Sequence, residues 1–572
     1  MHQSETKICQ NCSREFQIES EDFEFYEKIK VPPPTFCPEC RQQRRMMFRN
    51  FKTLYRRNSD RSMKSIISMY SQQKPYKIYS QEEWWKDDWD AKIFGRNFDF
   101  NRPFFEQFQE LLLAVPKFSI MNVHSQDCEY SNFVFGSKNC YLVFGTVDDE
   151  DCAYGHIVWE SKDSFDNLYL YKSELCYKCV DCLGSFKLFY CQECENCIES
   201  IGLFDCRSCN NCIGCVGLNL KSYHIFNEPV GKEGYKKFLE EHSILDSKTI
   251  GFILEKQLQL RKNLPQRYFF GSHNNNVSGN HIYNAHNIYH SFDIKSGEDS
   301  KYTYTARKVI DSYDVSFIPN IELSYEALTN NGGSRNYFTH LCVNSNDVYY
   351  SDTCFDSHNI FGCVGLKKGE YCILNKQYTK EEYEKMVPKI IEQMNSIPYI
   401  SEVKDEKREV RKKIIYKYGE FFPPELSPFY YNESIANEYL LLSKEEAITK
   451  GFRWNDEMPH PVGQETILND KLPQNPQDFN DELTKHILKC DKCGRNYRLI
   501  SKELMFYKEM NLPISRDCFN CRHQQRMNIR NDRCLWSGQC QKCGNNFQTS
   551  YSPAQQKEFK IYCKACYQSE LG

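Results

Sequence analysis

Twelve cysteines near the ends of the chain have the spacing of metal ligands. They form three sets, each with two Cys-x2-Cys pairs, one set near the N-terminus and two near the C-terminus. Four thiolates from two such pairs complete the tetrahedral coordination of zinc, although iron could occupy the same ligand set. Because the implied ligands include no histidine or carboxylate, we expect closed, structural sites rather than catalytic ones. The predicted ligands of three Zn²⁺ per chain are Cys9, Cys12, Cys37 and Cys40; Cys490, Cys493, Cys518 and Cys521; and Cys540, Cys543, Cys563 and Cys566.

A basic segment follows the last cysteine of the first two sets. One shift of 481 positions aligns these sets without a gap, and it also aligns their arginines. On a helix, arginines at i, i+4 and i+8 share one face, and guanidinium groups match phosphate oxygens. One hypothesis is therefore that these faces bind RNA or another polyanion, and the alternative is that they pair with acidic groups of this chain or of a protein partner. The arginines are Arg41, Arg45 and Arg49, and Arg522, Arg526 and Arg530.

The first cysteine set also carries a recognisable sequence pattern. In CQNCSREFQI and FEFYEKIKVPPPTFCPECR, an aromatic residue, a Phe-Tyr pair and prolines separate the two pairs of cysteines. This pattern resembles the treble-clef-like "probable zinc-binding" domain of bacterial proteins, and the second set departs from it at Phe519, where the first has Pro38. Nearly the whole chain is similar to large uncharacterised multi-zinc-ribbon proteins of candidate-phyla bacteria. The resemblance implies zinc binding and no established activity.

Length and composition limit the class of protein. A chain of 572 residues predicts several domains, and a net charge of −4 argues against a uniformly basic nucleic-acid-binding protein. The N-terminal sequence MHQSETKICQNC lacks the features of a signal peptide, and Cys-x2-Cys pairs are typical of a reducing compartment. The longest apolar run, 111–115, is too short to cross a bilayer. We therefore expect a cytoplasmic protein with no membrane contact and no small-molecule cofactor.

The centre of the chain is repetitive. Four consecutive 12-residue units begin at residue 127, with Cys128, Cys140, Cys152 and Ser164 in register, and the sequence period then becomes 15. Short repeats rich in aromatic and β-branched residues predict a β-solenoid, although the number of residues per turn stays open. A shift of 148 positions aligns GCVGL at 214–218 with its copy at 362–366, and a helical pattern follows each copy. The solenoid is therefore predicted to be duplicated.

The central cysteines have two interpretations. Cys206, Cys209, Cys212 and Cys215 could bind a metal or could form a buried ladder of small apolar side chains. The shift of 148 replaces the middle two by Ser357 and Ile360, which favours the ladder because a metal site does not tolerate the loss of two ligands. A metal in the first half alone stays open.

The predicted fold class is a multidomain, mainly β protein in which zinc-ribbon or treble-clef modules at both termini flank a duplicated β-solenoid with helical connectors. A helix at 104–112 is expected to dock on the next domain. The predicted divisions are 1–50, zinc module 1; 51–120, a basic and aromatic helical segment; 121–229, solenoid half 1; 230–267, a helical connector; 268–376, solenoid half 2; 377–480, a helix and a proline-containing linker; 485–532, zinc module 2; and 535–572, zinc ribbon 3.

The function predicted from these features is a non-catalytic binding or scaffold protein. Nucleic acid is the most specific partner that the arginines suggest, and a pure protein–protein scaffold is the first alternative. The second alternative is a solenoid enzyme acting on a polysaccharide or other polymer, although no acid–base or nucleophile constellation is recognisable in the sequence.

Overall fold

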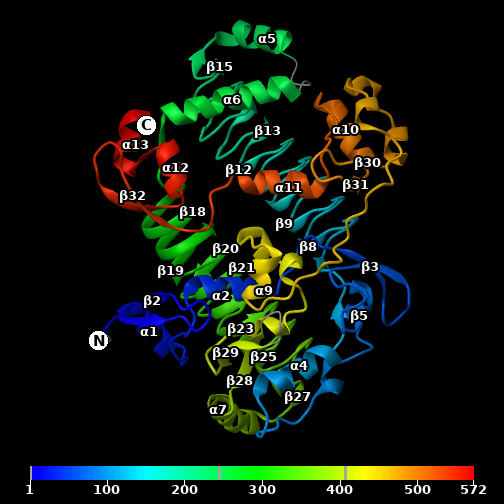
Figure 1. Ribbon diagram of the computed structural model, residues 1–572, viewed down its shortest axis with the longest axis vertical. Coiled ribbons are helices and arrows are strands. Elements are labelled where there is room, and N and C mark those ends of the chain that lie inside the picture. The colour runs from blue at the N-terminus through cyan, green and yellow to red at the C-terminus, as the bar shows by residue number, and fades with distance from the viewer. Residues whose placement is uncertain (1–2, 243–246, 405–408, 572) are drawn as a thin grey trace. The chain divides into compact units, whose positions relative to one another are not determined.

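Each unit of the fold joins two stretches that are far apart in the sequence. The computed structural model describes residues 3–242, 247–404 and 409–571, and it is mainly β (Figure 1). Unit 1 contains residues 1–119 and 269–457, and unit 2 contains residues 120–268 and 458–572. The first four-cysteine module therefore belongs with the second repeat half, and the other two modules belong with the first half. Sequence order alone does not indicate this crossed grouping.

A stack of parallel strands forms the centre of unit 2. Each strand pairs with the strand one repeat later at an offset of 12 residues, for example Leu168 with Val180, and isolated bridges continue this offset to residue 225. The offset equals the length of the first sequence repeats. The strands are β7 (Asn122–Val123), β8 (Asn132–Phe135), β9 (Phe144–Val147), β10 (His156–Trp159), β11 (Leu168–Tyr171), β12 (Val180–Leu183), β13 (Phe186–Phe189) and β14 (Ile198–Ile201), followed by the hairpin of β15 (His224–Ile225) and β16 (Glu228–Pro229).

Bends at every third residue shape this first stack. The left-handed backbone conformation recurs at three-residue intervals from His124 to Phe226, and it divides each 12-residue repeat into four segments. The residue after each bend lies inside the stack, as for the fully buried Cys176, Cys179 and Cys182. This geometry explains the three-residue spacing of the cysteines, which strand alternation does not.

The sequence period of 15 does not change the structural repeat. Strand pairing keeps the offset of 12 beyond residue 175, for example between Phe186 and Ile198. Because each segment has three residues, a 15-residue motif advances by one segment in each repeat and still places its cysteines inside. The apparent change of period is therefore a drift of the motif around an unchanged stack.

Unit 1 contains a second stack with the same offset. Ala285 pairs with Gly297 and Tyr325 with Tyr337, again 12 residues apart. Its first strands are longer than those of the first stack. The strands are β18 (Gly271–Ile294), β19 (Gly297–Lys301), β20 (Tyr304–Ile310), β21 (Tyr313–Glu322), β22 (Tyr325–Leu328), β23 (Asn336–His340), β24 (Asn346–Tyr349), β25 (His358–Phe361), β26 (Glu370–Ile373) and β27 (Lys376–Gln377).

Helices cover parts of both stacks. After the first stack come α5 (Gly231–Glu241) and α6 (Ser247–Asn263), and after the second comes α7 (Lys380–Ser396). The expected helix near residue 104 is α4 (Phe104–Ala114), and its Phe104 ring lies 5.3 Å from Tyr350 and 5.5 Å from Phe361. It therefore docks on the second stack and not on the next domain in sequence, because its aromatic face fits the aromatic rows of that stack.

The four-cysteine modules are small hairpins followed by helices. Module 1 contains β1 (Glu5–Ile8), β2 (Glu15–Ile18), α1 (Ser20–Lys28) and α2 (Pro38–Met46). Module 2 contains β30 (Leu488–Lys489), β31 (Asn496–Tyr497), α10 (Ser501–Glu509) and α11 (Phe519–Asn528). Module 3 contains β32 (Trp536–Gln539), β33 (Asn546–Thr549), α12 (Pro553–Glu558), β34 (Lys560–Tyr562) and α13 (Lys564–Leu571), and β34 pairs with β17 (Pro265–Arg267).

The remaining elements of unit 1 fill its periphery. They are β3 (Tyr55–Asn58), β4 (Ser65–Ser68), β5 (Ile78–Tyr79), α3 (Gln81–Trp85), β6 (Lys117–Phe118), β28 (Tyr399–Lys404), β29 (Val410–Tyr416), α8 (Ala436–Tyr439) and α9 (Lys444–Thr449).

Candidate metal centres and buried arginine contacts

The structure brings together each of the three predicted ligand sets. Within each set the four sulfur atoms lie within 4.8 Å of one another. One Sγ–Sγ pair in each set, Cys12–Cys37, Cys493–Cys518 and Cys543–Cys563, is 3.7 Å apart. Four sulfurs at about 2.3 Å from a tetrahedral metal ion are about 3.8 Å apart. The three sets therefore fit three metal ions with a complete thiolate shell.

Local structure positions these sulfurs. In module 2, Cys490 and Cys493 lie in the turn between β30 and β31, where Gly494 adopts a left-handed conformation, with a φ of 73°. Cys518 is the N-cap of α11, and its backbone N–H donates to Cys490 Sγ at 3.2 Å. Thiolates are stabilised at this end of a helix, because the helix N-terminus carries partial positive charge and free N–H groups. The second pair of cysteines therefore opens a helix, as the sequence pattern predicts.

In unit 1, the arginines of α2 are buried against the second stack. Arg41 donates to Asp314 through Nε at 2.9 Å, and Arg45 Nη1 reaches Asp314 at 3.0 Å and Glu326 at 2.7 Å. Arg49 donates to the hydroxyl of Thr329. The exposed fractions of Arg41, Arg45 and Arg49 are only 1%, 0% and 4%. The face predicted to bind a polyanion is therefore an internal contact of unit 1.

In unit 2, the arginines of α11 make the corresponding contacts with the first stack. Arg522 Nη1 lies 2.6 Å from Asp166 Oδ2, and Arg526 Nη1 lies 2.8 Å from Asp166 Oδ1. Arg530 binds Asp181 through two hydrogen bonds of 2.7 and 2.8 Å. Burial lowers the pKa of Arg526, although Asp166 opposes this effect. The carboxylate of Asp166 thus neutralises a buried pair of guanidinium groups.

The two docking contacts are equivalent position by position. The shift of 481 that aligns the arginines accompanies the shift of 148 that aligns Asp166 with Asp314 and Asp181 with Thr329. The rings follow the same rule: Phe25 stacks on Tyr313 at 3.9 Å, and Phe506 stacks on Phe165 at 4.3 Å. Applying both shifts to every residue would have revealed these acidic partners from the sequence.

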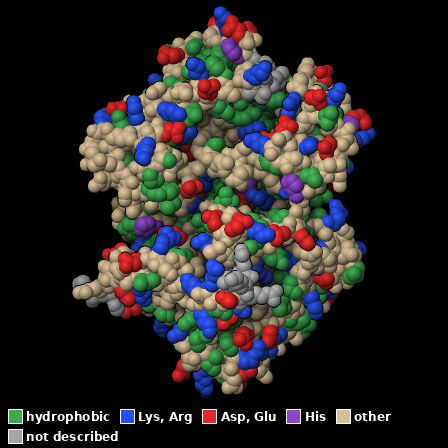
Figure 2. All heavy atoms as spheres, in the orientation of Figure 1, with side chains coloured by type: hydrophobic (Ala, Val, Ile, Leu, Met, Phe, Trp, Pro, Cys, Tyr) green, Lys and Arg blue, Asp and Glu red, His purple; other side chains and the backbone are tan. Residues whose placement is uncertain are grey.

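These contacts correct the polyanion hypothesis for the six arginines. Pairing with acidic side chains of the same chain, the alternative stated above, is what the structure contains, because burial of an arginine requires a nearby anion or acceptor. On the face drawn in Figure 2, basic and acidic side chains are interspersed rather than gathered into one basic area.

The central cysteines lie inside the first stack. Cys206 Sγ donates to the carbonyls of Phe204 and Cys215, both at 3.5 Å. Serine does the same at an equivalent inward position, where Ser185 Oγ donates to the carbonyl of Leu183 at 3.0 Å. Within residues 3–242, 247–404 and 409–571, no three central cysteines bring their sulfurs within 4.8 Å of one another. This placement agrees with the ladder interpretation, and it explains why cysteine and serine alternate there.

Unit 1 contains a counterpart of module 3 that lacks cysteines. Its hairpin of β3 and β4 aligns with β32 and β33 at the shift of 481, and KIYS at 77–80 aligns with KIYC at 560–563. The four ligand positions are occupied by Ser59, Ser62, Ser80 and Glu83.

Hydrogen bonds join the residues at these four positions. Ser59 donates to the Glu83 carboxylate, which also accepts the Ser80 backbone N–H at 2.9 Å. Burial alone would raise the pKa of Glu83, but hydrogen bonds from Ser59, Ser62 and Ser80 hold it below its ordinary value. A hydrogen-bonded cluster thus stands where module 3 has its metal ligands, and the sequence interpretation missed it because the cysteines are absent.

Comparison with known protein families and with curated proteins finds no match for this chain. Among the residues that the structure describes, no helix combines the length and the apolar composition needed to span a membrane.

Proposed function

We propose that the protein is a zinc-stabilised, non-catalytic binding scaffold. In this proposal the two strand stacks are β-solenoids with one 12-residue repeat per turn, and modules 1 and 2 are treble-clef-like. Zinc is the metal favoured by a four-thiolate ligand set, and such a closed set leaves no coordination position for a substrate.

The burial of the arginines carries this proposal. Modules of this size bury too little apolar surface to fold alone, so metal binding and folding are linked. The ordered module then holds α2 or α11 against a stack, where Asp314 or Asp166 neutralises the guanidinium groups. Zinc thus fastens a module to each stack, and no reaction is proposed.

Metal analysis combined with hydrogen exchange tests the proposal. The wild-type protein should contain three zinc ions, and Cys521→Ser should contain two, with faster amide exchange in residues 154–181 beneath α11. Cys197→Ser serves as the matched control because Cys197 lies inside the stack, so its zinc content should stay at three. An unchanged zinc content in Cys521→Ser, or unchanged exchange beneath α11, would contradict the proposal.

A further inference from the structure

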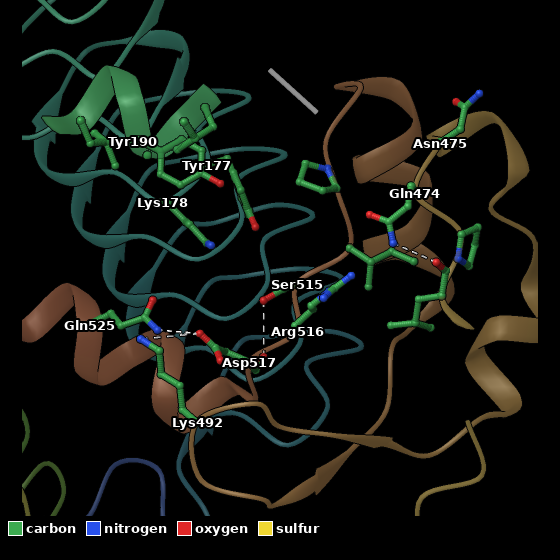
Figure 3. Close-up of a pocket in the computed structure, with 17 residues that line it drawn as sticks. Tyr177, Lys178, Tyr190, Gln474, Asn475, Lys492, Ser515, Arg516, Asp517 and Gln525 are labelled. Atoms are coloured by element: carbon green, nitrogen blue, oxygen red, sulfur yellow. Dashed lines mark hydrogen bonds and ion pairs between the residues drawn. The ribbon is translucent and has the colours of Figure 1, made fainter. Parts of the chain in front are cut away.

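Unit 2 contains a cavity of about 1130 Å³ beside module 2. Lys178 and the rings of Tyr177 and Tyr190, from the first stack, line one side, and the loop of Ser515, Arg516 and Asp517 lines the other (Figure 3). Helix α6 adds an apolar wall at Ile250 and Leu254. Small-molecule sites typically have volumes of about 300–1,000 Å³ and combine apolar walls with a few polar groups. The cavity is large enough for a small ligand.

The corresponding place in unit 1 is filled. The same two shifts align Lys178 with Glu326, Arg516 with Thr35 and Gln525 with Arg44. Lys178 and Glu326 also share the left-handed backbone conformation, with φ values of 52° and 47°. In unit 1 the remaining cavity beside Arg44 measures only about 20 Å³. The comparison shows what occupies this place when it is closed.

A carboxylate occupies the place in unit 1. Glu420 is buried, and its Oε1 accepts hydrogen bonds from Thr35 N at 3.0 Å and from Thr35 Oγ1 at 2.5 Å. Its Oε2 lies 3.2 Å from Arg44, which also pairs with Glu326 at 2.7 Å. Two acids of the same chain therefore satisfy the cationic group at this position.

Unit 2 has the opposite charge and no such plug. Lysine replaces Glu326 and arginine replaces Thr35, so the positions around the missing carboxylate become more basic. Among the described residues, no carboxylate lies within ion-pair distance of Lys178 or Arg516. The one acid that lines the cavity, Asp517, accepts a hydrogen bond from Gln525 at 2.6 Å and lies 3.8 Å from Lys492.

The environment of Lys178 is also unusual for a lysine. Its ammonium lies 5.3 Å from the centres of both the Tyr177 and Tyr190 rings. Burial lowers the pKa of Lys178 to about 8, although the nearby Asp166 opposes this effect. A cation that is partly desolvated and lacks an anionic partner destabilises the free protein, and an incoming anion would relieve that cost.

We propose that this cavity binds a small organic anion. Its carboxylate or phosphate group would lie between Lys178 and Arg516, in the position that Glu420 occupies in unit 1, and its apolar part would contact Tyr190, Ile250 and Leu254. Arginine suits this role because its planar guanidinium matches the oxygens of both anion types. The inference goes beyond the scaffold proposal and requires only that module 2 be folded.

Calorimetric titration of the zinc-loaded full-length protein tests the proposal. The probes are phenyl phosphate and benzoate, with benzyl alcohol as the neutral control. At least one anion should bind, and the stronger one identifies the preferred headgroup. Lys178→Glu and Arg516→Thr, which restore the unit 1 residue or charge, should each weaken binding by about tenfold or more. Lys178→Met should do the same without adding a negative charge, which provides a second variant should Lys178→Glu fail to fold.

Lys236→Met is the matched control, because Lys236 lies on α5 and its side chain is 70% exposed. Its affinity should equal that of the wild type. Failure of both anions to bind at millimolar concentration would overturn the proposal. Equal binding of benzyl alcohol, or wild-type affinity in Lys178→Met and Arg516→Thr, would overturn it as well.

Discussion

Replacing Asp166 by asparagine should destabilise the contact between α11 and the first stack. The Asp166 side chain is fully buried and accepts from Arg522 at 2.6 Å and from Arg526 at 2.8 Å. Removing one member of a buried ion network costs about 3–5 kcal/mol, because the remaining charges stay buried without a counter-charge. Among the described residues, Arg522 would keep Glu503 at 3.0 Å, whereas Arg526 would keep only the Tyr154 carbonyl at 3.0 Å. We therefore expect a loss of about 3 kcal/mol or more.

The equivalent change in unit 1 should cost less. After Asp314→Asn, Arg45 would still pair with Glu326 at 2.7 Å, so a full counter-charge remains beside one of the two guanidinium groups. Glu558→Gln is the control, since it removes an exposed pair with Lys262 at 3.0 Å and should cost about 0–1 kcal/mol.

Native-state hydrogen exchange at low denaturant concentration measures these losses locally. This assay suits a chain with two units, for which one global unfolding free energy is poorly defined. The relevant amides are those of α11 for Asp166→Asn and those of α2 for Asp314→Asn. A loss for Asp166→Asn no larger than that for Glu558→Gln would refute the argument that this buried network holds α11 in place.

Three further predictions follow from the same comparisons within the chain. The combined change Ser59→Cys, Ser62→Cys, Ser80→Cys and Glu83→Cys should raise the metal content from three ions to four, and a content that stays at three would show that the cluster cannot adopt ligand geometry. Asp149 is buried at an inward position where serine stands one repeat earlier and later, and burial raises its pKa well above the ordinary value. Folding therefore favours the protonated form, and the resulting destabilisation grows as the pH rises above the ordinary pKa of aspartate. Asp149→Ser should stabilise the protein by about 1–3 kcal/mol at pH 7 and by less at pH 4, and an equal gain in thermal unfolding at both pH values would contradict this. Cys206→Ser should cost only about 1 kcal/mol in urea unfolding, because a serine hydroxyl can donate to the same carbonyls, whereas a loss of a metal ion in this variant would contradict the ladder interpretation.

Several features of the site and fold follow from the sequence because they depend on local spacing. Two Cys-x2-Cys pairs place four sulfurs around one point regardless of the rest of the chain, and the structure gathers the three predicted sets. The helices after the stacks occur where the pattern indicates them, since amphipathic spacing acts within one element. The offset of 12 residues between paired strands was likewise present in the first repeats of the sequence.

The destination of the arginines was decided only by the tertiary structure. Arg41 meets Asp314 and Arg522 meets Asp166 across hundreds of residues, and a basic helix face has the same sequence pattern whether solvent, a polyanion or a buried carboxylate faces it. The grouping of each module with the stack farther away in sequence is another long-range result. Lys178 shows the same limit, since its change from Glu326 acquires meaning only when the cavity beside it is known. Sequence spacing thus fixed the metal ligands, whereas long-range burial and charge neutralisation decided what the cationic groups contact.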